Sequence, residues 1–312
     1  MKKHVPIHII SFILCFVSSY LQLAASVDPV IGNKVIIIKP GIKDQRISDE
    51  WKAALRGRMS GASIDSMAAI KRQLKNEEAE WRDLIISKAA EWNSYRDSLA
   101  IPFRNIRLPD TIYVMLGFLG VDDGFTFEQQ TVCLDITALS NVYGEAGLDE
   151  NESRISRIYA HEYTHLLHKE WARKTGYATK TFLDEILWEC LYEGIGMYRS
   201  LNPRWIPLND SLPAITRSAL DELYPVFTER LITIKQNDLL SDAEKRKLQA
   251  NLSRGVVSKK WGALPVAIWL SLEAKGDETR LTKWIDTGPF AVIELAKKYL
   301  PIDNREKFSS LY

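Results

Sequence analysis

Apolar residues recur at steps of three and four along most of the chain, which is the spacing of amphipathic helices. The first such stretch covers residues 49–98, and Gly57 and the Ser60-Gly61 pair divide it into at least two helices. After Asn141 the pattern continues nearly to the end, with a proline-containing loop over residues 203–213. The chain is therefore predicted to be mostly helical.

Strand patterns are confined to three short stretches. Residues 35–38 form an apolar run that ends at a Pro-Gly pair, and residues 111–116 and 131–136 are rich in residues that favour strands. An Asp-Asp-Gly turn signal at residues 122–124 predicts that the last two stretches pair as an antiparallel hairpin. The expected fold class is α+β, with a small antiparallel sheet packed on many helices.

Composition indicates a folded, water-soluble body. The chain has 312 residues and carries 41 lysines and arginines against 40 acidic residues, so no basic field would attract nucleic acid. We expect four segments: a signal peptide at 1–25, a strand and helices at 26–104, a catalytic core at 105–202 and a helical part at 203–312. The last segment is expected to belong to the same compact unit as the core, and the oligomeric state is left open.

The first 25 residues have the layout of a secretory signal peptide. Lys2 and Lys3 precede a mostly apolar run at residues 5–20, and small residues follow at 24–26. The run contains Pro6 and is shorter than the ~20 apolar residues that a membrane span needs, so cleavage is favoured over anchoring. The mature chain is expected to be exported, periplasmic or extracellular, with no stable membrane span.

Cleavage would remove Cys15 and leave two cysteines, Cys133 and Cys190. An exported protein can hold them as one disulfide, but two buried thiols that pack as small apolar residues fit the sequence equally well. The pairing is therefore left open.

The residues that indicate a chemistry are the HEYTH sequence at residues 161–165. On a helix, positions i and i+4 lie on one face, so His161 and His165 can bind the same zinc ion. Glu162 projects beside them, where it can accept a proton from a metal-bound water. The sequence therefore predicts two metal ligands and a catalytic base on one helix.

This helix is predicted to begin at a capping box formed by Asp149 and Glu152. It also carries His168, which lies about 4.5 Å further along the axis than His165. Zinc bonds are near 2 Å, so His168 is expected to pack against the ligands or support them rather than bind the ion. The third ligand should come from another helix.

A glutamate on the helix predicted over residues 181–198 is the expected third ligand. Glu185, Glu189 and Glu193 follow at four-residue steps on one side of it. Glu193 is favoured over Glu189, because the glycines at positions 194 and 196 let two helices approach closely enough to share a metal. Three protein ligands and a water would then complete a site for one zinc ion.

The HEYTH sequence and the YEGIG sequence at residues 192–196 resemble those of the gluzincin metallopeptidases, which include thermolysin and the zinc aminopeptidases. The resemblance covers residues 113–198. It implies a thermolysin-like core in which an edge strand before the metal helix binds extended substrate, here residues 131–135 or their partner near Tyr113. The aminopeptidase motif, the Asn-Glu-x-x-Ser-Asp form of the thermolysin helix and the metzincin extension are absent, which indicates a divergent bacterial branch of the group.

The expected activity is hydrolysis of a peptide or protein substrate by a zinc-activated water, with Glu162 as general base. The group that stabilises the developing oxyanion is left open among Tyr192, Tyr198, Arg254 and Trp261. Two other functions are also left open: a non-catalytic binding or scaffold protein that keeps the fold, and a zinc hydrolase of non-peptide amides. The intact Glu162 favours an enzyme, since a protein without turnover does not need a base.

Overall fold

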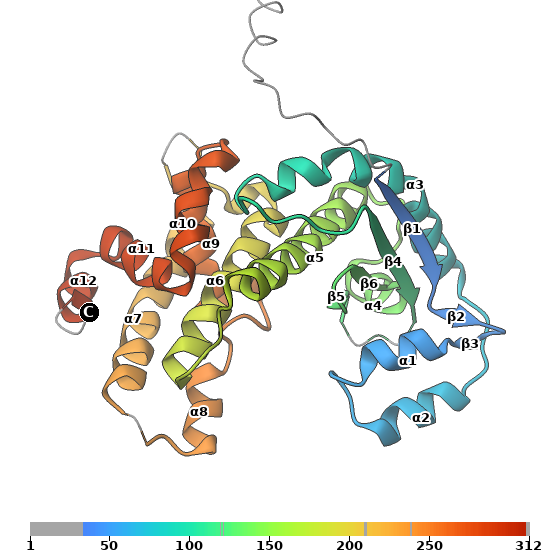
Figure 1. Cartoon of the computed structure of the whole chain (residues 1–312), viewed down its shortest axis with the longest axis horizontal. Coiled ribbons are helices and arrows are strands. Elements are labelled where there is room, and N and C mark those ends of the chain that lie inside the picture. Colours follow the sequence, from blue (N-terminus) through green and yellow to red (C-terminus); the bar gives the residue numbers. More distant parts are fainter. Residues whose placement is uncertain (1–33, 119, 121, 209–210, 238, 310–312) are drawn as a thin grey trace, which may run out of the picture. The chain divides into compact units, whose positions relative to one another are not determined.

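Six strands form two small sheets in the computed structural model, which describes residues 34–118, 120, 122–208, 211–237 and 239–309 (Figure 1). The strands are β1 Val35–Pro40, β2 Ile42–Lys43, β3 Arg46–Ile47, β4 Thr111–Gly117, β5 Gly124–Phe127 and β6 Thr131–Asp135. The described residues belong to one compact unit. The expected signal peptide lies outside them.

Helices account for most of the remaining described residues, as the apolar spacing predicts. The α-helices are α1 Asp49–Leu55, α2 Gly61–Ala69, α3 Asn76–Ala100, α4 Ile136–Tyr143, α5 Asp149–Thr175, α6 Phe182–Ser200, α7 Ala214–Gln236, α8 Asp242–Gln249, α9 Ala263–Ala274, α10 Thr282–Thr287, α11 Ala291–Tyr299 and α12 Ile302–Ser309. The 3-10 turns are η1 Pro203–Trp205, η2 Val257–Lys259, η3 Glu278–Leu281 and η4 Gly288–Phe290. No helix among the described residues has the length and apolar character needed to cross a bilayer.

The larger sheet is mixed, and the predicted antiparallel hairpin is wrong. Its strand order is β1-β4-β6-β5, in which β1 is parallel to β4, β4 is parallel to β6, and β5 is antiparallel to β6. The two predicted strands, β4 and β6, are parallel because the chain between them makes a third strand, β5, before it turns back. Parallel neighbours require such a longer connection. Since β4 and β6 each have a neighbour on both sides, neither can be the predicted substrate-binding edge.

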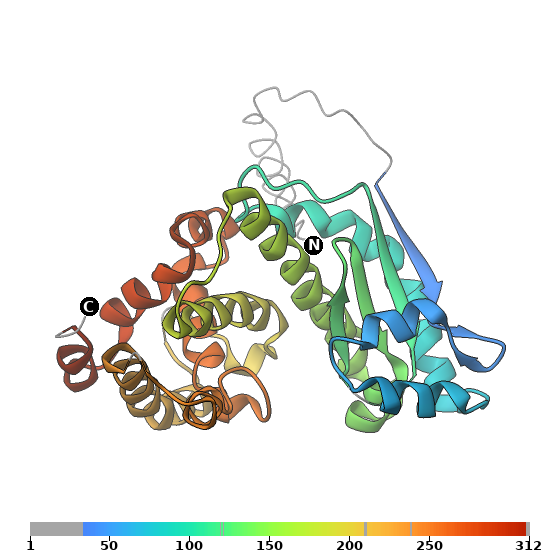
Figure 2. The same ribbon diagram turned by 60° about the horizontal axis from the view of Figure 1, so that its bottom comes forward.

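Helices cover the sheet on both faces, so every residue of β6 is buried. Helix α3 contacts β1 and α5 contacts β5, and Figure 2 shows α1 and α2 in front of the strands. The indole of Trp51 in α1 lies so close to Gly117 that a Cβ there would come within 1.9 Å of the ring. Glycine at this position therefore lets α1 close over the end of β4.

The helix boundaries depend on side-chain caps, and two predicted boundaries change. Strand β6 ends one residue early, because Asp135 accepts hydrogen bonds from two amides of the first turn of α4. The capping box predicted for α5 is not formed. Leu148 occupies the cap position without a side-chain hydrogen bond, and Asp149 and Glu152 lie in the first turn. Their negative charges there interact favourably with the helix dipole.

Helix α6 is packed between α5 and α9. A Cβ on Gly194 would lie only 2.5 Å from Cγ1 of Val266 in α9, so glycine permits this close approach. The apolar residues of α9 are almost completely buried and complete the core. Cys133 and Cys190 are both buried free thiols.

Candidate metal centre

Helices α5 and α6 bring His161, His165 and Glu193 together in a group that could hold a metal ion, with possible ligand atoms within 4.8 Å of one another. The Nε2 atom of His161 lies 3.6 Å from Glu193 Oε2, and that of His165 lies 3.7 Å from Glu193 Oε1. Ligand atoms about 2.0–2.1 Å from a tetrahedral zinc are about 3.3 Å apart. The observed distances are close to that spacing.

Gly196 allows this approach of the two helices. A Cβ at this position would lie 2.9 Å from Cε1 of His161 and 3.0 Å from Cε1 of His165. The two glycines of α6 therefore have different roles: Gly194 faces α9, and Gly196 faces the histidine rings. Gly196 therefore has the predicted role of letting the two metal-binding helices approach, whereas Gly194 allows α6 to approach α9 instead.

A short hydrogen-bond chain orients His161. Its Nδ1 atom lies 3.0 Å from the hydroxyl oxygen of Ser200, and that hydroxyl donates to the main-chain oxygen of Met197. Since the Ser200 proton is used there, the oxygen accepts a hydrogen bond from Nδ1–H of His161. Nε2 is then the ring nitrogen that faces Glu193 and that would bind a metal.

His165 is held by stacking rather than by a hydrogen bond. Its ring lies parallel to that of Tyr192, with centroids 3.9 Å apart, and its Nδ1 atom has no hydrogen-bond partner among the described residues. Burial, together with the charge of His161, lowers the pKa of His165 well below its usual value. Burial also lowers the pKa of His161, but the hydrogen bond and charge of Glu193 and the charge of Glu162 outweigh it and raise the pKa overall. His165 is thus a neutral imidazole, the form that binds metals.

Glu162 lies beside the ligand group without belonging to it. Its Oε1 atom is 4.0 Å from Nε2 of His161, and its side chain packs against Gly124 at the start of β5. Burial raises the pKa of Glu162 to about 7; the charge of Glu193 adds to this and that of His161 opposes it. A carboxylate with such a pKa can accept a proton near neutral pH.

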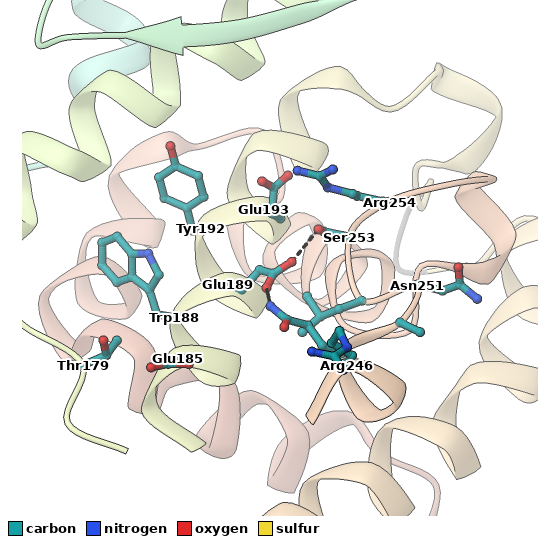
Figure 3. Close-up of a pocket in the computed structure, with 13 residues that line it drawn as sticks. Thr179, Glu185, Trp188, Glu189, Tyr192, Glu193, Arg246, Asn251, Ser253 and Arg254 are labelled. Carbon is teal, nitrogen blue, oxygen red and sulfur yellow. Dashed lines mark hydrogen bonds between the residues drawn. The ribbon is translucent and has the colours of Figure 1, made fainter. Parts of the chain in front are cut away.

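The metal-binding group faces a cavity of about 690 Å³, which Glu162, β5 and the loop at residues 251–260 also line. A second cavity of about 660 Å³ shares Tyr192, Glu193, Ser253 and Arg254 with the first. Figure 3 shows Arg254 extending from its loop toward Glu193. The centre therefore has open space on more than one side of Glu193.

Glu189 is not part of the metal-binding group. It lies one turn before Glu193 and accepts hydrogen bonds of 2.7 Å from Gln249 and Ser253 (Figure 3). These contacts tie α6 to the end of α8 and to the loop that follows it. Glu189 therefore positions the loop that borders the metal centre.

His168 is completely buried among aromatic rings, including those of Phe103, Trp171 and Trp188. Neither ring nitrogen has a hydrogen-bond partner in the described part of the chain, and burial lowers the pKa of His168 to about 3. A neutral packing residue was one of the two roles expected for it.

The four candidates for stabilising the oxyanion lie in different parts of the structure. Tyr192 and Arg254 line the metal cavity. Tyr198 lines a different cavity and donates a hydrogen bond of 3.0 Å to Glu278. Trp261 is buried and donates to the main-chain oxygen of Ala250. Sequence reasoning did not single out Ser200 or Lys260, which also line the cavity, because no local pattern marks residues so far along the chain from the histidines.

Comparison of the chain with protein-family models, with curated proteins and with solved structures finds no match. Function is therefore inferred from the site itself. The geometry of the two histidines and Glu193 supports a metal-binding group, and its donor set of two imidazoles and one carboxylate is the first guide to the metal.

Proposed function

We propose that this protein is a zinc-dependent peptidase whose ion is bound by His161, His165 and Glu193. The observation that carries the proposal is the position of Glu162, a buried carboxylate 4.0 Å from a ligand nitrogen and in the same cavity as the metal-binding group. A purely structural metal site has four protein ligands and needs no such base. We also expect export, with removal of the first 25 residues.

Two nitrogen donors and one carboxylate oxygen are a typical ligand set for catalytic zinc, which keeps its fourth position open. When bound, such an ion acts as a Lewis acid and makes a coordinated water more acidic. The neutral His165 and the oriented His161 are suited to hold it. The Nδ1 atom of His161 contacts the Ser200 hydroxyl, and the Nδ1 atom of His165 is buried. Nε2 of each ring is therefore left for the ion.

Glu162 would take the proton of the attacking water and pass it to the leaving amine. Its pKa near 7 allows both steps at neutral pH, because neither the charged nor the neutral form is strongly favoured. Glycine at position 124 leaves room for this side chain, since a Cβ there would lie 3.1 Å from Cγ of Glu162. Tyr192 and Arg254 are the candidates for stabilising the oxyanion, since both side chains line this cavity.

An extended peptide is the substrate that suits the surroundings. Strand β5 is the last strand in the order β1-β4-β6-β5, and its residues Gly124 and Thr126 line the metal cavity. An outer strand offers main-chain donors and acceptors that can pair with an extended chain. In this proposal β5 therefore replaces β6 and β4 as the strand that binds substrate.

The proposal can be tested by digesting a peptide library with the zinc-loaded protein and identifying the products by mass spectrometry. We expect cleavage that is lost in Glu162→Gln, with a decrease of at least about a hundredfold while the zinc content stays at the wild-type level. An unchanged zinc content would show that the metal centre of the variant is intact. Cleavage that persists in Glu162→Gln, or zinc-loaded protein that cuts no peptide, would contradict the proposal.

A further inference from the structure

The metal cavity is rich in cations beyond what its acidic residues can neutralise. Seven arginines and lysines line it against five aspartates and glutamates. One of the five acids, Glu193, would be a metal ligand, and the ion would add further positive charge. The chain as a whole is nearly neutral, with a formal net charge of +1. The excess is therefore a local property of this cavity.

Two of the five acidic residues form ion pairs with three of these cations. Arg58 forms an ion pair with Asp122, and Glu150 binds both Arg154 and Arg157. These three arginines are therefore not free to bind a ligand without losing a partner.

The remaining cations differ in their surroundings. Lys169 donates a hydrogen bond to the hydroxyl of Thr126. The side chains of Arg204, Arg254 and Lys260 have no hydrogen bond or ion pair within the described residues. Arg204 and Arg254 are exposed at the rim of the cavity, whereas Lys260 is half-buried.

Lys260 is the most informative of the three. Lys260 lines the same cavity as Glu193 and Asp123. Burial lowers the pKa of Lys260, while the charges of these two carboxylates oppose that effect. Its neighbour Lys259 is different: it is exposed and forms an ion pair of 2.6 Å with Glu222, outside the cavity. A half-buried cation without a fixed partner is costly unless a ligand supplies the opposite charge.

We propose that Lys260, assisted by Arg254 and Arg204, binds a carboxylate of the substrate beside the metal centre. The proposal rests on the peptidase function proposed above and names the substrate class: peptides with a carboxylate close to the scissile bond. An ammonium and a guanidinium both form charge-assisted hydrogen bonds with carboxylates, and the planar guanidinium can bind both oxygens. The carboxylate can belong to an aspartate or glutamate side chain or to the carboxyl terminus of the peptide.

The test measures binding, so that it does not depend on turnover. Fluorescent peptides that differ only as glutamate or glutamine, and as free or amidated carboxyl terminus, are titrated against zinc-loaded Glu162→Gln protein. In one of the two pairs, we expect the peptide with the carboxylate to bind at least about tenfold more tightly than its neutral counterpart. Preference for internal glutamate would identify a side-chain carboxylate, and preference for the free terminus would identify the α-carboxylate; either supports the proposal.

The matched variants are Lys260→Ala and Lys259→Ala, which remove the same charge from adjacent positions, each in the Glu162→Gln background. The tighter binding of the carboxylate peptide should be lost in Lys260→Ala and kept in Lys259→Ala. Lys260→Arg should retain most of it. Zinc content and circular dichroism confirm that each variant is folded. Equal affinity for charged and neutral peptides, or equal losses in both alanine variants, would overturn the proposal. Carboxylate-selective binding without any cleavage by the wild type would support it and reject the peptidase function instead.

Discussion

At the scale of single residues, the centre depends on how each imidazole is fixed. His161 is oriented by the hydroxyl of Ser200, and His165 by stacking on Tyr192. The two histidines could be predicted because helical spacing brings positions i and i+4 to one face, and Glu193 because glycines follow it on the next helix. Ser200 could not, since its contact with His161 joins positions 39 residues apart.

Replacing Ser200 by alanine should therefore weaken zinc binding without unfolding the protein. The Nδ1–H group of His161 would lose its acceptor, and loss of such an orienting partner typically costs about 10–100-fold in metal affinity. The measurement is a competition titration against a chromogenic chelator. Thr should substitute for Ser200 with a smaller effect, because its hydroxyl can accept the same bond. An affinity that is unchanged in Ser200→Ala would show that the bond does not support the centre.

At the scale of helices and strands, prediction succeeded where the periodic signal was long and failed where it was short. The long helices α5 and α6 follow their apolar stripes, and α1 and α2 are separated at the predicted glycines. Strand β5 has only four residues, which gives too few alternations to recognise. Missing β5 produced the wrong hairpin, since β4 and β6 then appeared to be joined directly. The predicted capping box of α5 is not formed, because Asp149 and Glu152 lie one position further into the helix than predicted.

The two glycines of α6 allow a prediction at this scale. Gly196→Ala should abolish or strongly weaken zinc binding, because its Cβ would lie 2.9–3.0 Å from both histidine rings. Gly194→Ala should instead destabilise the fold by about 1–3 kcal/mol, because its Cβ would meet Val266 of α9. Zinc titration and urea unfolding of the metal-free proteins distinguish the two effects. Equal zinc affinities in the two variants would contradict the assignment of Gly196 to the metal face.

At the scale of the whole molecule, buried charges join elements that are distant in sequence. Glu78 at the start of α3 is almost fully buried and accepts hydrogen bonds from Arg72 at 2.6 and 2.8 Å and from the hydroxyl of Thr137 in α4 at 2.6 Å. It also caps its own helix by accepting a bond from the amide of Lys75. Contacts of this kind are not visible in a single sequence, because they depend on the packing of separate segments.

Glu78 should make the stability of the protein depend on pH. Burial alone would raise the pKa of Glu78, but the hydrogen bonds from Arg72, Thr137 and Lys75 and the charge of Arg72 outweigh it, so the pKa is lowered. The carboxylate therefore stabilises the fold above its unfolded pKa of about 4.3, and this contribution is lost as the pH falls through the lower folded pKa. Glu78→Gln should lower the free energy of unfolding by about 2 kcal/mol at neutral pH and by less in acid.

Urea unfolding at pH 7 and pH 3 measures this difference. The neighbouring Glu77 is exposed, so Glu77→Gln serves as the control and should change little at either pH. A loss in Glu78→Gln that is the same at both pH values would show that the charge of Glu78 is not what stabilises the fold.

The central claim, a zinc ion bound by His161, His165 and Glu193, is tested most directly by the zinc content of the purified protein beside Glu193→Ala and Glu189→Ala. These two glutamates lie one turn apart on α6, but only Glu193 faces the histidines. We predict about one zinc per chain in the wild type and in Glu189→Ala, and a lost or much weakened ion in Glu193→Ala. A wild-type protein that binds no zinc even after incubation with the metal would contradict the claim.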